Sequence, residues 1–207
     1  MSATVSEIFR TARKIIEKGI VRNGITSVGV ALYNIVSERA KDVLAPNGIV
    51  LSNGLYPITV KQLRNVYTES AHSAVWVYRD HAQIEIAAKN TCWTRMAYAK
   101  ELAHIYLGFV NDEYENLDML LTAARTARQN LPAHNNEEVP NDEMFCFYLA
   151  IELLLPWGDL RDEAMDMHDK GKTHYEIAKR FMLPEWIVSH FFDGGWCSRS
   201  WEGNRAI

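Results

Sequence analysis

Cysteine is scarce in this chain of 207 residues, and no two of its cysteines are spaced as C-x-x-C; they are Cys92, Cys146 and Cys197. An odd number of isolated cysteines excludes a disulfide framework and a thiolate zinc cluster, and it is typical of a reducing compartment. The sequence also lacks an apolar run of the ~20 residues needed to cross a bilayer. Its N-terminus has no signal-peptide pattern. We therefore expect a cytoplasmic protein without a membrane partner.

An excess of charge of one sign is also missing. Lysine and arginine number 22 against 26 acidic residues, for a net charge of −4, and 48% of the residues are hydrophobic. These values exclude a charge-rich disordered chain and argue against a nonspecific nucleic-acid binder. The length predicts one sizeable domain, or one domain with a small appendage.

The apolar periodicity predicts a fold of class α+β that is mainly α, with a small antiparallel β-sheet. Strands are expected at 73–79 and 83–87, on either side of Asp80 and His81. Loops are expected at 46–57 and 132–142, where Pro, Asn and Gly or acidic residues are dense. Helices are expected at 5–18, 27–44, 60–68, 91–107, 113–130, 143–155, 174–182 and 184–192.

The predicted helix 91–107 contains the sequence Lys100-Glu101-Leu102-Ala103-His104. Residues 100 and 104 are one turn apart, so their side chains emerge on the same face of a helix. Zinc hydrolases use this spacing for two histidines, with a glutamate after the first as general base. Here the glutamate and the second histidine are present, and Lys100 stands in place of the first histidine.

Two segments, R-M-A-Y-A-K-E-L-A-H-I-Y-L from Arg95 and E-M-F-C-F-Y-L-A-I-E-L-L-L-P from Glu143, together resemble the ImmA/IrrE family of metallopeptidase-like proteins. The resemblance covers about residues 70–192 and implies a zincin-like helical core. It assigns Glu101 to the general base, His104 to the second zinc histidine and Glu143 to the third ligand. Cys146 takes the position of a small alanine.

Two residues depart from the family pattern: Lys100 replaces a zinc histidine, and Phe147 replaces a polar Asn or Asp. A protonated lysine has no lone pair and repels a metal cation, so only two of the three ligands of a catalytic zinc remain. We therefore expect no cofactor. Instead, the Lys100 ammonium is predicted to occupy the cation position in a partly buried cleft and to neutralise Glu101, Glu143 or both.

Other interpretations of these residues stay open. Lys100 and Glu101 are alternatively solvated surface charges, with His104 covering the core. A metal is alternatively held by His104, Glu143 and a histidine of the strand pair, which is His72 or His81. Cys92 and Cys146 are interpreted as small buried hydrophobes, because neither has a histidine base in a recognisable pattern.

Residues 173–192 predict two short helices around a tight turn, similar to a helix-turn-helix and to a segment that follows the metal domain in ImmA/IrrE-like proteins. Helix 184–192 would then read DNA, with Lys179, Arg180, Ser189 and His190 near the nucleic acid. The segment has little net positive charge, so packing is the favoured role. Ile177, Phe181 and Ile187 are the expected packing residues.

The predicted organisation is an N-terminal helical region over 1–70, a metallopeptidase-like core over 71–157 and a C-terminal helical region over 158–207. The resemblance implies a catalytically degenerate protein that binds and regulates a phage-type or stress-response transcriptional regulator of a bacterium or phage. The alternative is an active zinc-dependent endopeptidase that cleaves such a repressor, with Glu101 as general base. A third interpretation is a DNA-binding accessory factor.

Overall fold

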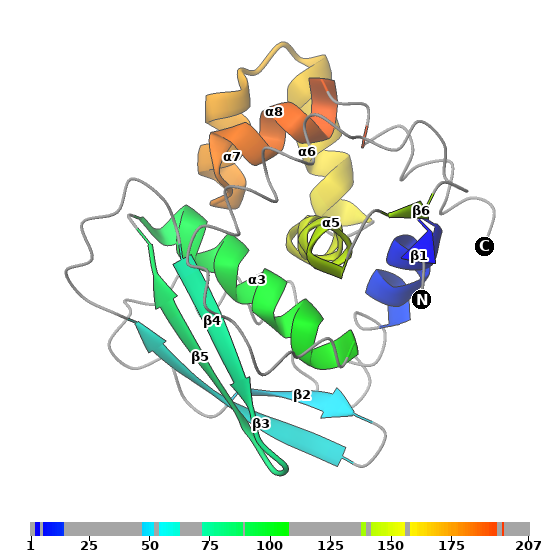
Figure 1. Ribbon diagram of the computed structural model, residues 1–207. Coiled ribbons are helices and arrows are strands. Elements are labelled where there is room, and N and C mark those ends of the chain that lie inside the picture. Colours follow the sequence, from blue (N-terminus) through cyan, green and yellow to red (C-terminus); the bar gives the residue numbers. More distant parts are fainter. Residues whose placement is uncertain are drawn as a thin grey trace.

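The computed structural model describes residues 3–4, 6–14, 47–51, 54–62, 72–88, 90–107, 138–139, 142–155, 158–193 and 196. Helices predominate among them and a small sheet is present, so the predicted class, α+β and mainly α, is confirmed (Figure 1). Besides an N-terminal helix over 6–14, the elements are β1 (Ala3–Thr4), β2 (Asn47–Leu51), β3 (Gly54–Gln62), β4 (His72–Val77), β5 (Ala82–Ala87), α3 (Thr91–Leu107), β6 (Glu138–Val139), α5 (Asp142–Leu154), α6 (Asp159–Asp169), α7 (His174–Phe181) and α8 (Glu185–Asp193).

The main sheet has four strands in the order β2-β3-β5-β4. The pairs β2–β3 and β4–β5 are antiparallel, but β3 and β5 run parallel, with Ile58 opposite Ala82. The expectation of a purely antiparallel sheet is therefore wrong, and the sheet is mixed. A parallel neighbour joins strands that are distant in sequence, so local turn signals do not reveal it.

Two local predictions before β4 are also wrong. Residues 46–57 were expected to form a loop, and they contain β2 and the start of β3, joined as a hairpin. A helix was expected at 60–68, opened by a capping box at Thr59, but residues 54–62 form β3. The Thr59 hydroxyl instead donates to the carbonyl of Ala82 on β5 (3.3 Å). Residues 54–62 thus belong to the same sheet as β4 and β5, rather than to a helical region.

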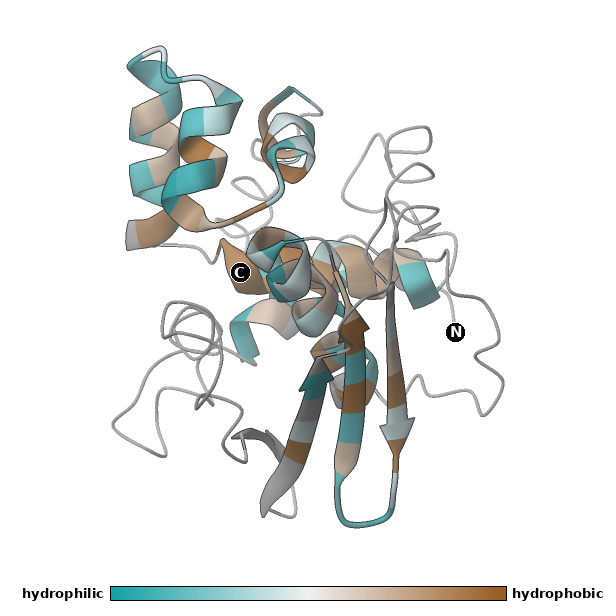
Figure 2. Cartoon of the chain, turned by 90° about the vertical axis from the view of Figure 1, so that its left-hand side faces the viewer, coloured by the Kyte–Doolittle hydropathy of each residue, from teal (hydrophilic) through white to brown (hydrophobic). Residues whose placement is uncertain are grey.

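The predicted antiparallel strand pair is confirmed as β4 and β5. Apolar and polar residues alternate along β5 in Figure 2, and the turn that joins β4 to β5 is hydrophilic. Val75, Ile84 and Ile86 are buried on the face that meets α3. One face of the pair therefore packs on the helix, and the other face carries Gln83 and Glu85 of β5 together with the exposed Trp76 of β4.

Two helices that sequence analysis predicted form the centre of the molecule. α3 packs on β4 and β5 on one side and on α5 on the other (Figure 1). Every residue of α5 from Met144 to Leu154 is buried, which explains why this helix reads as one continuous apolar run. The N-terminal helix over 6–14, part of the predicted helix 5–18, contributes Ile8, Phe9 and Ala12 to the same core.

The C-terminal helices α6, α7 and α8 follow α5. Thr173 and Glu176 form the predicted capping box at the start of α7: the Thr173 hydroxyl accepts from the Glu176 amide, and the Glu176 carboxylate accepts from the Thr173 amide. α7 is followed by its C-cap residue Met182, whose φ of 50° lies in the left-handed region. Ile177, Phe181 and Ile187 are buried, so their predicted packing role is confirmed.

Several predictions lie outside the described residues. These are the helices at 27–44 and 113–130, Cys197, and most of the loop at 132–142. Within that loop, Glu138–Val139 forms β6 and pairs with β1. Of the helices that the structure describes, none combines the length and the apolar character required to cross a membrane.

Candidate functional site

Lys100, Glu101 and His104 lie on α3 and are withdrawn from solvent. Their exposed fractions are 2%, 2% and 0%. Residues 100 and 104 lie on one face of the helix because they are one turn apart. The alternative that Lys100 and Glu101 are solvated surface charges is therefore wrong, and these groups require compensation inside the fold.

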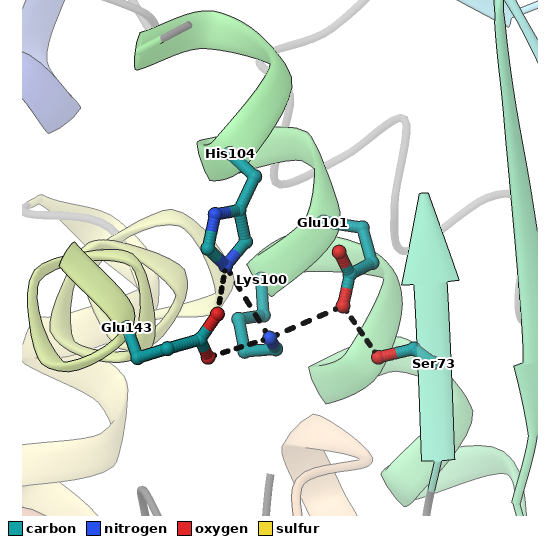
Figure 3. A network of polar contacts seen from close by, with 5 residues as sticks. All are labelled: Ser73, Lys100, Glu101, His104 and Glu143. Atoms are coloured by element: carbon teal, nitrogen blue, oxygen red, sulfur yellow. Dashed lines mark hydrogen bonds and ion pairs between the residues drawn. The ribbon is translucent and has the colours of Figure 1, made fainter. Parts of the chain in front are cut away.

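The compensation for Lys100 comes from two helices. Its ammonium Nζ lies 2.8 Å from Oε2 of Glu143, in the first turn of α5, and 3.2 Å from Oε1 of Glu101 (Figure 3). Sequence analysis predicted that Lys100 would neutralise one or both carboxylates, and both lie within ion-pair distance of it. The lysine thus joins α3 to α5 through charges that water screens little.

His104 completes the cluster. Its Nε2 lies 2.9 Å from Oε1 of Glu143 and 3.3 Å from Nζ of Lys100. A single ring nitrogen either donates or accepts a hydrogen bond, so it does not serve both neighbours at once. The shorter contact, to a carboxylate, favours donation from His104 to Glu143. Each oxygen of Glu143 then accepts from a different residue of α3.

Ser73 is a member of this cluster that sequence analysis missed. Its hydroxyl, on β4, donates to Oε1 of Glu101 at 2.6 Å. The alternation of side chains along a strand could have indicated the side of the sheet on which Ser73 lies. Ser73 is two residues before the buried Val75, so it lies on the strand face that packs on α3. Oε1 of Glu101 is thereby shared between a hydroxyl and an ammonium, and the carboxylate is fixed by two elements.

The electrostatics of the cluster follow from this geometry. Burial acts to raise the pKa of Glu143, but the hydrogen bond from His104 and the charge of Lys100 outweigh it and hold that pKa at about 2. Burial acts to lower the pKa of Lys100, and the carboxylates of Glu101 and Glu143 reverse this and raise it. The lysine is consequently an ammonium, without a lone pair, at any physiological pH.

We expect the Glu143 carboxylate to stabilise the protein in a pH-dependent way. Its pKa is about 2 in the folded chain against 4.5 in the unfolded chain, so the unfolded state takes up the proton first as pH falls. The stabilisation is complete above pH 4.5 and is lost as pH falls through about 2. It amounts to at most about 3 kcal/mol. Urea unfolding at about pH 5 and about pH 3 measures it.

The Glu143→Gln variant is the matched test of this pH dependence, since it removes the titrating group and keeps its size. The loss of unfolding free energy between the two pH values should be smaller in the variant than in the parent. Glu176 has a pKa of about 2 as well, so Glu176→Gln serves as the comparison for an exposed carboxylate. An unchanged loss in Glu143→Gln would contradict the assignment.

The two described cysteines differ in their surroundings. Cys146 is fully buried one turn after Glu143, and burial raises the pKa of its thiol well above the usual value, so it is a small hydrophobe as predicted. Cys92, near the start of α3, is half-buried, and burial raises its thiol pKa as well. Burial outweighs the charge of Arg95 near Cys92 and that of Lys100 near Cys146, so neither thiol pKa is lowered as in a nucleophile.

Where the structure describes them, the side chains that the sequence offers as metal ligands do not form a metal site. Within the described part of the chain, no group of three or more His, Cys, Asp and Glu side chains is arranged to hold one. His81 is half-buried at the turn after β4, where it contacts Asp80 (2.8 Å) and stacks on Tyr78. The side chain of His72 lies outside the described residues. His104 and Glu143 thus do not fit zinc, because an ammonium adjoins both.

A second buried ion pair was not anticipated from the sequence. Arg161 of α6 donates to Oε2 of Glu152 on α5 (2.8 Å) and to the carbonyl of Leu155 (2.6 Å), and both charged side chains are buried. Oε1 of Glu152 accepts from the Trp196 indole (2.9 Å). A lone glutamate in the apolar run of α5 was the available signal, because such a charge needs a buried partner.

The residues proposed to read DNA are mostly engaged within the protein. Arg180 pairs with Glu163 (2.7 Å), the Ser189 hydroxyl donates to Asp193 (3.0 Å), and His190 is buried between the rings of Tyr148 and Trp186. Lys179 is exposed. The packing role predicted for α7 and α8 therefore agrees with these contacts better than base readout does.

Arg95 of α3 attaches this helical pair to the core. Its guanidinium is buried and donates to the carbonyls of Phe181 and Met182, where α7 ends. Those carbonyls are among the groups that a helix leaves unpaired at its C-terminus. A side chain of α3 thus caps α7.

No family model matches the chain, and no curated protein or solved structure matches it with significance. The geometry of the cluster therefore carries the functional argument.

Proposed function

We propose that this chain is a catalytically degenerate, ImmA/IrrE-like metallopeptidase relative that works as a binding and regulatory protein. The observation that carries the proposal is the position of the Lys100 ammonium, between Glu101, Glu143 and His104 at 2.8 to 3.3 Å. These are the three groups that the family resemblance assigns to zinc chemistry. The lysine places its charge where the metal charge would be, so the carboxylates stay compensated without an ion.

Hydrolysis is disfavoured by the state of Glu101. A general base needs an accessible carboxylate next to an activated water, and a metal normally brings the pKa of that water to about 7. Glu101 is buried, and its Oε1 already accepts from Ser73 and adjoins the Lys100 ammonium. Because the Lys100 ammonium stands at the position of the first metal ligand, the residues present do not support hydrolysis by a zinc-bound water.

The finer fold assignment belongs to the same proposal. A zincin-like core is supported by the order of the strand pair β4–β5, the helix α3 with the K-E-x-x-H sequence, and the helix α5 that supplies Glu143. A helix-turn-helix-like arrangement of α7 and α8 is supported by their contact across a tight turn. We propose that the chain is cytoplasmic, which its isolated cysteines support. As protein partner we propose a transcriptional regulator of phage or stress-response type, and this part rests on the resemblance alone.

The Lys100→His variant tests the proposal through metal content. Histidine at position 100 restores a set of three possible zinc ligands. Two are the imidazoles at positions 100 and 104, one turn apart on α3, and the third is Glu143 at the start of α5. We expect about one zinc per chain in Lys100→His, and far below that in the parent purified without chelator. Lys100→Gln is the matched control, because it also removes the charge but adds no imidazole, and it should bind no zinc. Elemental analysis of the purified proteins gives the measurement.

The opposite result identifies the alternative function. Stoichiometric zinc in the parent, together with chelator-sensitive cleavage of a purified repressor, would make the chain an active endopeptidase with Glu101 as base. Binding to duplex DNA that weakens steeply with salt would favour the accessory-factor interpretation. Binding of a purified regulator by the zinc-free parent, without cleavage, is the result we expect.

A further inference from the structure

A groove lies between the N-terminal end of α3 and the pair α7–α8, away from the Lys100 cluster. Figure 1 shows these helices next to one another at that end of α3. The cavity has a volume of about 680 Å³, within the roughly 300–1,000 Å³ of small-molecule sites. It starts at Asn90, Cys92 and Trp93, so it is about 10 Å along the helix from Lys100. It is therefore a separate feature of the molecule.

Aromatic and apolar side chains make up much of the lining of the groove. Trp93, Tyr175 and Trp186 contribute rings, and the buried Ala178, Leu183 and Pro184 contribute apolar surface. Trp186 is held against the rings of Phe147 and His190, so its position is fixed by the core. Tyr175 is 59% exposed, which is unusual for so large a ring. A planar aromatic group is the occupant that such rings bind best.

The charges at the groove favour an anion. Lys179 lines it and makes no ion pair among the described residues, whereas its neighbours Lys172 and Arg180 are neutralised by Glu176 and Glu163. The N-terminal end of α3 lies at the same place; Asn90 caps its Trp93 amide (3.1 Å), and its first turn holds no acidic residue to offset the positive end of the helix dipole. The negative charge at the groove is Glu185, in the first turn of α8, where the dipole of its own helix stabilises it.

We propose that this groove binds a small aromatic carboxylate, with the ring among Trp93, Tyr175 and Trp186 and the carboxylate at Lys179. The aromatic side chains explain the ring. Lys179, which makes no ion pair among the described residues, explains the acid together with the α3 N-terminus. The inference does not depend on the function proposed for the Lys100 cluster, because the two sites share no residue.

The experiment compares 3-phenylpropionate with 3-phenylpropionamide, which has the same ring and chain but no charge. Binding to the full chain is followed by the tryptophan fluorescence of the protein, since two tryptophans line the groove and the phenyl probes do not fluoresce at that wavelength. We expect saturable binding of both probes, with the carboxylate bound about fivefold more tightly, as for an exposed ion pair.

Four exposed positions supply variants that should fold normally. Lys179→Gln should remove the preference for the carboxylate, and Glu185→Gln should increase it. Lys170→Gln, an exposed lysine paired with Asp166 outside the groove, should leave it unchanged. Tyr175→Ser should weaken both probes about equally. Absence of saturable binding at millimolar probe, equal affinities for the two probes, or an intact preference in Lys179→Gln would overturn the proposal.

Discussion

Replacing Lys100 with methionine should lower the free energy of unfolding by about 3–5 kcal/mol at neutral pH. Methionine nearly keeps the volume of the side chain, so the loss comes from charge rather than from a cavity. Glu101 and Glu143 would remain buried close together without the ammonium that now lies 3.2 and 2.8 Å from them. Urea unfolding followed by circular dichroism measures the change.

The pH dependence of the Lys100→Met variant separates this explanation from simple misfolding. Lowering the pH protonates the carboxylates and removes their repulsion, so the deficit relative to the parent should shrink in acid. Lys61→Met is the matched control, since Lys61 forms an exposed ion pair with Glu85 at the same distance of 2.8 Å. It should cost less than about 1 kcal/mol. Equal losses in the two variants would contradict the assigned role of Lys100.

Arg161→Met should have an effect of similar size, about 3–5 kcal/mol, because it leaves the buried carboxylate of Glu152 without its cationic partner. The change also removes two hydrogen bonds to the carbonyl of Leu155, just after α5. The indole of Trp196 would still donate to Glu152, but an indole carries no charge to balance the carboxylate. Thermal or urea unfolding of the variant gives the measurement.

A double variant tests the mechanism of this loss. If the uncompensated charge of Glu152 causes it, Glu152→Gln combined with Arg161→Met should recover part of the stability. Arg180→Met is the control, because Arg180 forms a comparable but exposed pair with Glu163, and should cost less than about 1 kcal/mol. A double variant no more stable than Arg161→Met would show that the charge of Glu152 is not the cause.

The parts of the fold that local sequence determines were predicted well. The helix 91–107 matches α3, the run from Glu143 matches α5, and the capping box at Thr173 begins α7. Helix periodicity and capping depend on residues within four positions of each other, so one sequence can show them when both agree. One sequence likewise shows the shared face of Lys100 and His104. The capping-box pattern at Thr59, which lies in β3, shows that capping alone is not sufficient.

The missed features depend on contacts between distant residues. The hairpin of β2 and β3 was expected to be loop because Pro, Asn and Gly are dense in it, and the parallel partner of β3, β5, begins 20 residues after β3 ends. The contact of Ser73 with Glu101 and the pairing of Glu152 with Arg161 likewise form only when separate elements pack together. The sequence was sufficient to predict that Lys100 pairs with Glu101 or Glu143. The hydrogen bond from the Ser73 hydroxyl could not be predicted, because it forms only when β4 packs on α3.

The link from Arg95 to the end of α7 has a mechanical consequence for the groove. One wall of the groove belongs to α3 and the other to α7 and α8, and the Arg95 guanidinium fastens the second wall to the first through the carbonyls of Phe181 and Met182. Tilting the helical pair would break buried charge-assisted hydrogen bonds, at about 1.5–3 kcal/mol each. The width of the groove is thus set before any ligand arrives, and a ligand that fits it loses little affinity to ordering the protein.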